Sequence, residues 1–68
     1  MTLSARNHLP GIIDDIVMGD VLAHVTVRVG TNVIESVITR RSAEEMGLKK
    51  GDAVTAVVKA TEVMLAKG

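Results

Sequence analysis

Hydroxyl and basic residues stand together near both ends of this 68-residue chain, in the segments Ser4–Arg6 ("SAR") and Lys59–Thr61 ("KAT"). Each segment combines a hydroxyl donor, a cation and an alanine small enough to leave neighbouring backbone N–H groups accessible. Such donor-rich segments suit a tetrahedral oxyanion, which accepts many hydrogen bonds and needs little positive charge. The same residues are also ordinary at strand ends, where the cations are solvated, and the residue types alone favour that simpler interpretation.

Groups that could catalyse a reaction are few. The adjacent carboxylates Asp14-Asp15 would point to opposite faces of a strand and would not converge, so a turn or bulge explains them better. Glu44-Glu45 fits the first turn of a helix, where carboxylates complement free N–H groups. His8 and His24 lie far apart, and no glycine-rich phosphate loop occurs. We therefore expect no enzymatic activity, no catalytic cofactor and no metal site.

The composition favours another copy of the chain as a partner. Sixty-eight residues form one domain, near the size at which a single core barely offsets chain entropy. The chain has no cysteine, which excludes disulfides and thiolate zinc sites. Yet 47% of its residues are hydrophobic, more than so small a core can bury, and large exposed apolar patches mark interaction sites. We expect a homo-oligomer.

Other partners are disfavoured by charge and by the lack of aromatic residues. Eight basic residues balance eight acidic ones, and Phe, Tyr and Trp are absent, so a basic groove with stacking platforms for nucleic acid is missing. No apolar run approaches the roughly 20 residues that span a bilayer. The N-terminus lacks a basic region followed by an apolar stretch. We expect a cytoplasmic protein without nucleic-acid or membrane partners, with residues 1–68 as a single domain.

Strand patterns dominate the chain. Val21–Val29 alternates between apolar and polar residues, the pattern of a half-buried strand. Gly11–Met18 and Val33–Thr39 also read as strands, the first with a bulge or bend at its two aspartates. Ala53–Lys59 is apolar on both faces, so we expect both faces to be covered. A last strand is predicted from about Glu62 to Ala66.

One short helix is predicted between the third and fourth strands. Ser42 and Glu45 have the spacing of a capping box, with Ser42 as the N-cap. Gly47 stands where a helix end needs a left-handed residue. Five short strands around one helical turn predict an all-β fold, a small five-stranded barrel of the OB kind.

Three blocks of the sequence resemble the molbindin family, the small molybdate-binding Mop proteins. They are "SARNHLPG" at Ser4–Gly11, "ESVITRRSAEEMGLKKGDAV" at Glu35–Val54 and "VVKATEVML" at Val57–Leu65. The likeness spans nearly the whole chain, and its most specific parts are the "SARN" opening and "KAT". Pro10 departs from the family pattern, in which a lysine is common there. Because proline lacks an N–H, Pro10 should lie at a strand start or edge.

The resemblance implies an OB-like barrel that assembles as a hexamer, a trimer of dimers, and binds molybdate or tungstate between subunits. The SAR segment of one subunit would then meet the KAT segment of another. The donors implied for this site are Ser4, Ala5, Arg6, Lys59, Ala60 and Thr61. The family also has a second class of site nearer the threefold axis, for which the candidates here are Asn7, Gly19, Asp20 and Val21.

Two functions follow from the resemblance. The first is intracellular storage and buffering of molybdate or tungstate. The alternative is an oligomerisation or ligand-sensing module that acts through a protein partner in molybdate uptake or regulation. No DNA-binding helices and no Walker motif accompany the domain in this sequence, so a free-standing binding protein is favoured.

Overall fold

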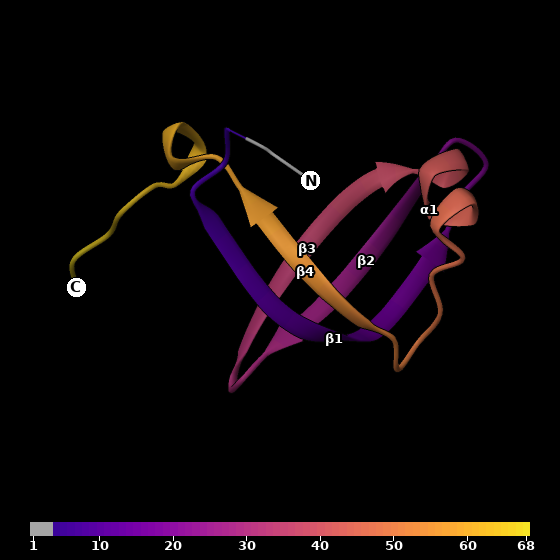
Figure 1. The fold of residues 1–68 in the computed structure, drawn as a ribbon, viewed down its shortest axis with the longest axis horizontal. Helices are drawn as coiled ribbons and strands as arrows, with labels where there is room; N and C mark the ends of the chain where they lie inside the picture. Colours follow the sequence, from indigo (N-terminus) through magenta and orange to yellow (C-terminus); the bar gives the residue numbers. More distant parts are fainter. Residues whose placement is uncertain (1–3) are drawn as a thin grey trace.

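The structure is a computed structural model that describes residues 4–68, in which four strands form one antiparallel sheet (Figure 1). The order of strands across the sheet is β3-β2-β1-β4. A short helix, α1, connects β3 to β4, and one 3₁₀ turn, η1, follows β4. The bounds are β1 Asn7–Met18, β2 Leu22–Val29, β3 Asn32–Thr39, α1 Arg40–Met46, β4 Ala53–Val58 and η1 Ala60–Glu62.

The long strand β1 is shared between two partners. Its first half, from Asn7 to Ile12, pairs with β4, and its second half, from Ile12 to Met18, pairs with β2. The register with β2 shifts between Ile13 and Asp15, which confirms the bulge predicted at the two aspartates. Pro10 lies in the half of β1 that has a neighbour on one side only. The expectation that Pro10 lies at an edge is therefore confirmed.

The bend in β1 depends on Gly11. A Cβ atom added at Gly11 would lie 2.6 Å from the carbonyl oxygen of Arg28 and 2.8 Å from Cγ1 of Val27. Contacts this short leave no room for any side chain, so glycine permits β1 to pass close over β2. The curvature that results is visible in Figure 1.

The core lies on the concave face of the curved sheet. Ile13, Val25 and Val27 form its buried centre. The alternation predicted for the second strand is confirmed, because Ala23, Val25 and Val27 are all buried. Partly buried side chains pack around this centre from the other strands and from the loop after α1: Ile16, Val29, Ile34, Ile38, Leu48 and Val54.

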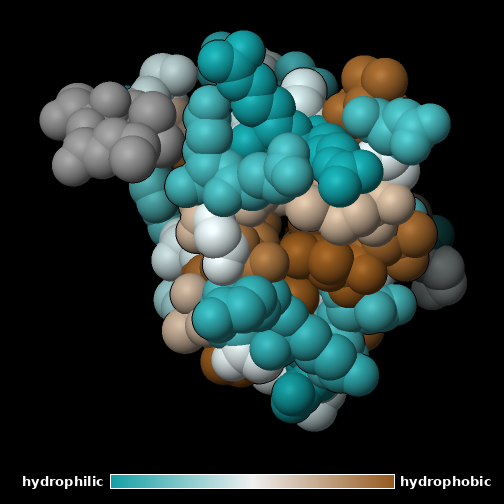
Figure 2. Space-filling model, turned by 90° about the vertical axis from the view of Figure 1, so that its right-hand side faces the viewer, coloured by the Kyte–Doolittle hydropathy of each residue, from teal (hydrophilic) through white to brown (hydrophobic). Residues whose placement is uncertain are grey.

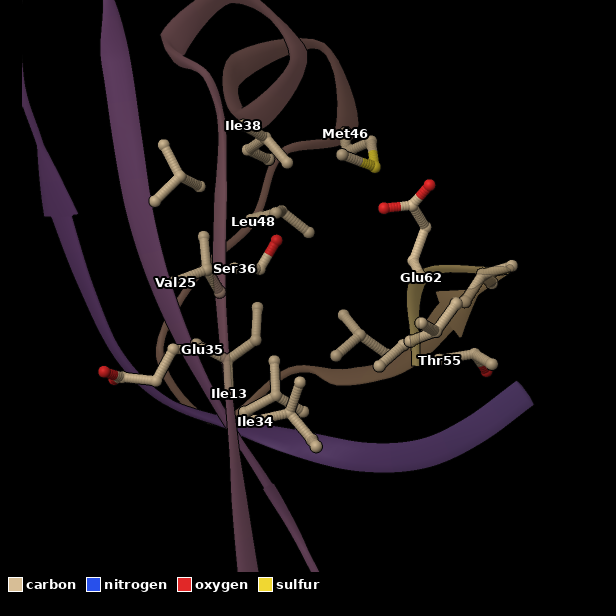
Figure 3. Close-up of a pocket in the computed structure, with 16 residues that line it drawn as sticks. Ile13, Val25, Ile34, Glu35, Ser36, Ile38, Met46, Leu48, Thr55 and Glu62 are labelled. Atoms are coloured by element: carbon tan, nitrogen blue, oxygen red, sulfur yellow. The ribbon is translucent and has the colours of Figure 1, made fainter. Parts of the chain in front are cut away.

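The sheet does not close into a complete barrel. β3 and β4 are its two edges and do not pair with each other. Between them lies an open cleft of about 760 Å³ with mostly apolar walls, and Glu62 and Met46 stand at its rim (Figure 3). Figure 2 shows apolar side chains reaching the surface between two polar regions. A single chain therefore leaves part of its hydrophobic core exposed to solvent.

The fifth strand predicted at Glu62–Ala66 is wrong for the single chain, although the all-β class with one short helix is confirmed. Glu62 ends η1, and no residue from Val63 onward pairs with a strand in the part of the chain that the structure describes. The segment leads away from the sheet after η1 (Figure 1). Met64 and Leu65 are 92% and 94% exposed. Within the single chain β4 is also not covered on both faces, because Val57 is exposed.

The helix begins earlier than predicted. Its N-cap is Thr39, whose side-chain oxygen accepts a hydrogen bond from the Ser42 N–H at 3.0 Å, so Ser42 is not the N-cap. Glu45 forms an ion pair with Arg41 at 3.1 Å instead of closing a capping box. Gly47 ends the helix in the left-handed region at φ 62°, as predicted.

Candidate functional site

β1 and β4 bring the two donor segments together at one end of the molecule. Asn7 and Val58 are register partners, so Ser4–Arg6 enters β1 beside the point where Lys59–Thr61 leaves β4 (Figure 1). The side chain of Asn7 strengthens this junction, because its Nδ2 donates to the Val58 carbonyl at 3.1 Å. These two residues are 51 positions apart in the sequence. All six donors predicted for the first site therefore lie at one end of a single chain.

The exposure pattern places the cations of this end on the outer face of the sheet. Arg6 and His8 are exposed, whereas Ala5 and Asn7 are half-buried, so the alternation of β1 continues beyond its first residue. Lys59, directly after β4, is also exposed. No carboxylate lies within salt-bridge distance of Arg6 or Lys59 among residues 4–68. The outer face at this end is accordingly basic.

The donors of the two segments have no partners among the residues that the structure describes. The side chains of Ser4, Arg6, Lys59 and Thr61 form no hydrogen bond to residues 4–68. The other three arginines each form an ion pair with a carboxylate. The distances from Nε to the carboxylate oxygen are 3.3 Å for Arg28, 3.6 Å for Arg40 and 3.1 Å for Arg41. Free hydroxyl, amide and cationic donors without a competing carboxylate are the chemistry that an oxyanion requires.

The 3₁₀ turn η1 shapes the second segment. The Glu62 N–H donates to the Lys59 carbonyl at 2.9 Å, and the Val63 N–H donates to the Ala60 carbonyl at 3.3 Å. These bonds do not use the N–H groups of Ala60 and Thr61, which leaves both available to a ligand. The turn thus holds two backbone donors beside the Lys59 and Thr61 side chains.

The candidates for the second class of site are not brought together within one chain. Gly19–Val21 forms the turn between β1 and β2, at the opposite end of β1 from Asn7. This turn packs against α1, because the Arg40 N–H donates to the Val21 carbonyl at 2.8 Å and the Arg40 side chain donates to the Gly19 carbonyl at 3.3 Å. Asn7 and the turn that contains Asp20 could share a ligand only across two copies of the chain.

Two exposed pairs of titratable groups lie elsewhere on the sheet. Asp14 pairs with Arg28 at 3.3 Å, and His24 Nε2 lies 3.3 Å from Glu35. No group of three His, Asp or Glu residues within residues 4–68 could hold a metal ion. No helix of this described range is long and apolar enough to cross a membrane.

One contact at the candidate site was not predicted from the sequence. His8 Nε2 lies 3.1 Å from the carbonyl oxygen of Ala5, inside the first donor segment. The signal that could have indicated it was the position of His8, two residues after Arg6 on the same face of a strand.

The described residues form a small curved antiparallel sheet of the OB kind, with hydroxyl, amide and cationic donors gathered at one end. The chain belongs to the TOBE domain family, whose model matches residues 3–65. It is 46% identical over 66 residues to "Molybdenum-pterin-binding protein 2" of Clostridium pasteurianum, covering 96% of this chain and 97% of that protein. It is 42% identical to "Molybdenum transport protein ModE" of Azotobacter vinelandii over 66 residues, which cover 24% of that longer protein.

Solved structures share the fold closely. A molybdate-binding protein from Sporomusa ovata superposes with a TM-score of 0.94 at 37% identity, covering 98% of this chain and 100% of that one. The "cytoplasmic molybdate-binding protein ModG", solved with molybdate bound, superposes with a TM-score of 0.82 at 41% identity, covering 88% of this chain and 43% of that one. The predicted membership of the molbindin (Mop) group and the OB-like fold class are confirmed.

Proposed function

We propose that this chain binds molybdate or tungstate between the subunits of a homo-oligomer and stores and buffers the oxyanion in the cytoplasm. The observation that carries the proposal is the set of unpaired donors that β1 and β4 gather at one end of the molecule. The relatives are named for binding molybdate or molybdenum-pterin, which supports a molybdenum oxyanion as the ligand. The description of ModG as cytoplasmic supports the location. Residues 1–68 then form one Mop domain.

The ligand groups of the proposed site come from both segments. The side chains would be the hydroxyls of Ser4 and Thr61 and the cations of Arg6 and Lys59. The backbone would add the N–H groups of Ala5, Arg6, Ala60 and Thr61. The second site would combine Asn7 of one copy with the Gly19, Asp20 and Val21 turn of another.

The bare oxyanion suits this site better than a pterin complex. A pterin is a flat aromatic heterocycle, and proteins hold such rings by stacking aromatic side chains on them. This chain contains no Phe, Tyr or Trp. The donors described above match the oxygen atoms of the anion and need no stacking partner.

Two features support the homo-oligomer. The chain exposes 5494 Å² of surface, whereas a folded monomer of 7.2 kDa is expected to expose roughly 4,100 Å². Both edges of the sheet are unpaired, and the segment after η1 is extended and exposed. We expect this segment of one copy to add as a fifth strand to another copy, because unpaired edges accept strands. The resemblance to molbindins makes a hexamer, a trimer of dimers, the expected assembly.

Calorimetric titration of the purified chain with oxyanions tests the proposal. Molybdate and tungstate are tetrahedral dianions of nearly the same size, so we expect them to bind alike. Sulfate has the same charge and shape but is smaller, and hydrogen bonds from donors spaced for the larger anion weaken beyond about 3.2 Å. Phosphate, partly protonated at neutral pH, brings an O–H for which the donors offer no acceptor. Displacement of micromolar molybdate by millimolar sulfate would show a general anion site instead.

The alternative function is a ligand-sensing or oligomerisation module that acts through a protein partner. The match to 24% of ModE, a molybdenum transport protein, supports this alternative, because it shows such a domain within a longer chain. The two functions differ in what they require. A storage protein binds the oxyanion with full affinity alone, whereas a sensing module changes its affinity or its assembly when the partner is added.

A further inference from the structure

We propose that His8 is a positioning residue of the oxyanion site, which holds the peptide between Ala5 and Arg6 so that the Arg6 N–H is presented to the ligand. The inference rests on the function proposed above and deepens it. It concerns a side chain that would itself not touch the anion.

The contact that supports it joins the ring of His8 to the backbone of the first donor segment. His8 Nε2 lies 3.1 Å from the carbonyl oxygen of Ala5. A carbonyl oxygen only accepts hydrogen bonds, so Nε2 carries the proton and donates. The two residues are three positions apart, so the bond connects the segment that precedes β1 to the beginning of that strand.

Because of the geometry of the peptide unit, this contact also sets the direction of the Arg6 N–H. The Ala5 carbonyl and the Arg6 N–H belong to the same peptide, and residues 4–68 contain no cis bond. In a trans peptide the C=O and N–H bonds point in opposite directions. Holding the carbonyl toward His8 therefore turns the Arg6 N–H away from the ring. A hydrogen bond accepted by the carbonyl also polarises the N–H of the same peptide.

The Arg6 N–H is available for a ligand. Among the described residues it donates to no backbone or side-chain acceptor. The hydrogen bond from His8 to the Ala5 carbonyl therefore helps to set the direction of the free Arg6 N–H.

Among residues 4–68, no other side chain forms a hydrogen bond or ion pair with His8. His8 is paired across the sheet with Val57, and its exposed neighbours Arg6 and Lys59 are both cations. The carboxylate nearest in sequence to the second segment, Glu62, points into the cleft on the concave side (Figure 3). His24 differs, because its ring faces Glu35. His24 therefore provides a matched control for a histidine on the same sheet.

The test compares molybdate affinity among four variants, measured by calorimetry at neutral pH and constant ionic strength. His8→Ala and His8→Leu remove the donor, and we expect each to weaken binding by about three- to tenfold, the usual effect of one hydrogen bond. His8→Gln keeps an amide N–H at a similar reach, and we expect affinity within about twofold of the parent chain. His24→Ala should bind as the parent does. Thermal melts at one protein concentration establish that all variants are folded.

The outcomes separate this inference from the function on which it rests. If the parent chain binds molybdate and either donor-free variant binds equally well, the role of His8 is wrong and the proposed function stands. The same conclusion follows if His8→Gln is as weak as His8→Ala, because a donor would then not be what matters. If the parent chain binds no molybdate, the proposed function falls and this inference with it.

Discussion

Asn7 and Val58 face each other across β1 and β4, and the Asn7 side chain donates to the Val58 carbonyl at 3.1 Å. This bond lies where both donor segments leave the sheet, so it fixes Ser4–Arg6 relative to Lys59–Thr61 within one chain. Each copy therefore presents a complete set of hydroxyl, amide and cationic donors at one end. The donors can therefore differ in how much each contributes to oxyanion affinity, and the two segments of one site can come from one copy or from two.

Hydroxyl donors should matter more than the Arg6 charge. We expect Ser4→Ala combined with Thr61→Ala to weaken molybdate binding more than Arg6→Ala does. A hydrogen-bond partner removed from a desolvated site costs about 1–3 kcal/mol, whereas the charge of an exposed cation is screened by solvent. Arg6→Ala also keeps its backbone N–H.

Calorimetry of both variants checks this expectation, with Thr55→Ala on the exposed face of β4 as a control that should bind normally. A loss for Arg6→Ala that equals or exceeds the loss for the double variant would mean that charge, not hydrogen bonding, selects the ligand.

The assembly can be tested through the exposed C-terminal segment. We expect the full chain to form a homo-oligomer, with a hexamer as the expected size, when measured by light scattering at micromolar concentration. A chain that ends at Glu62 lacks Val63–Gly68 and should assemble less, because it offers no fifth strand to a neighbour. A full-length chain that is folded and monomeric would contradict the oligomer and the intersubunit site together.

Gly11 should be essential for the curvature of the sheet. Its added Cβ would meet the Arg28 carbonyl at 2.6 Å, and forcing atoms into a packed region typically costs about 1–3 kcal/mol. We therefore expect Gly11→Ala to lower the free energy of unfolding by about that amount, as measured by denaturant titration. Gly68→Ala is the matched control, since no atom lies within 4 Å of a Cβ at that position. Equal stability of the two variants would show that β1 can shift away from β2 without cost.

The parts of the fold that the sequence predicted correctly are those with a local physical signal. The alternation in Val21–Val29 placed β2 and its buried face, because successive side chains in a strand point to opposite sides. The paired aspartates placed the bulge in β1, and Gly47 placed the helix end. Each of these features depends on residues within a few positions of one another.

The parts that were wrong or missing depend on competition or on distant contacts. Thr39 and Ser42 are both hydroxyl residues that could cap a helix, and the strand β3 delivers Thr39 in the extended conformation that an N-cap needs, at ψ 147°. The last predicted strand has a suitable sequence but no neighbour within the chain. The six donors of the proposed site could be named from the sequence through the resemblance. Their meeting at one end of a single chain follows from the pairing of β1 with β4, which no local pattern contains.

Whether one site draws its two segments from one copy or from two can be decided with mixed oligomers. One variant carries Ser4→Ala, and the other carries Thr61→Ala; each alone should bind molybdate weakly. If a site combines Ser4–Arg6 of one copy with Lys59–Thr61 of another, an oligomer refolded from an equal mixture contains about one intact site in four, because each contact between copies pairs the two variants at random. If both segments come from the same copy, every site in the mixture carries one substitution, and no tight site appears.

We expect the mixture to contain tight sites, since the resemblance to molbindins places the anion between subunits. Calorimetry of the mixture, with separately refolded oligomers combined afterwards as the control, distinguishes the two arrangements by the presence or absence of a fraction of tight sites.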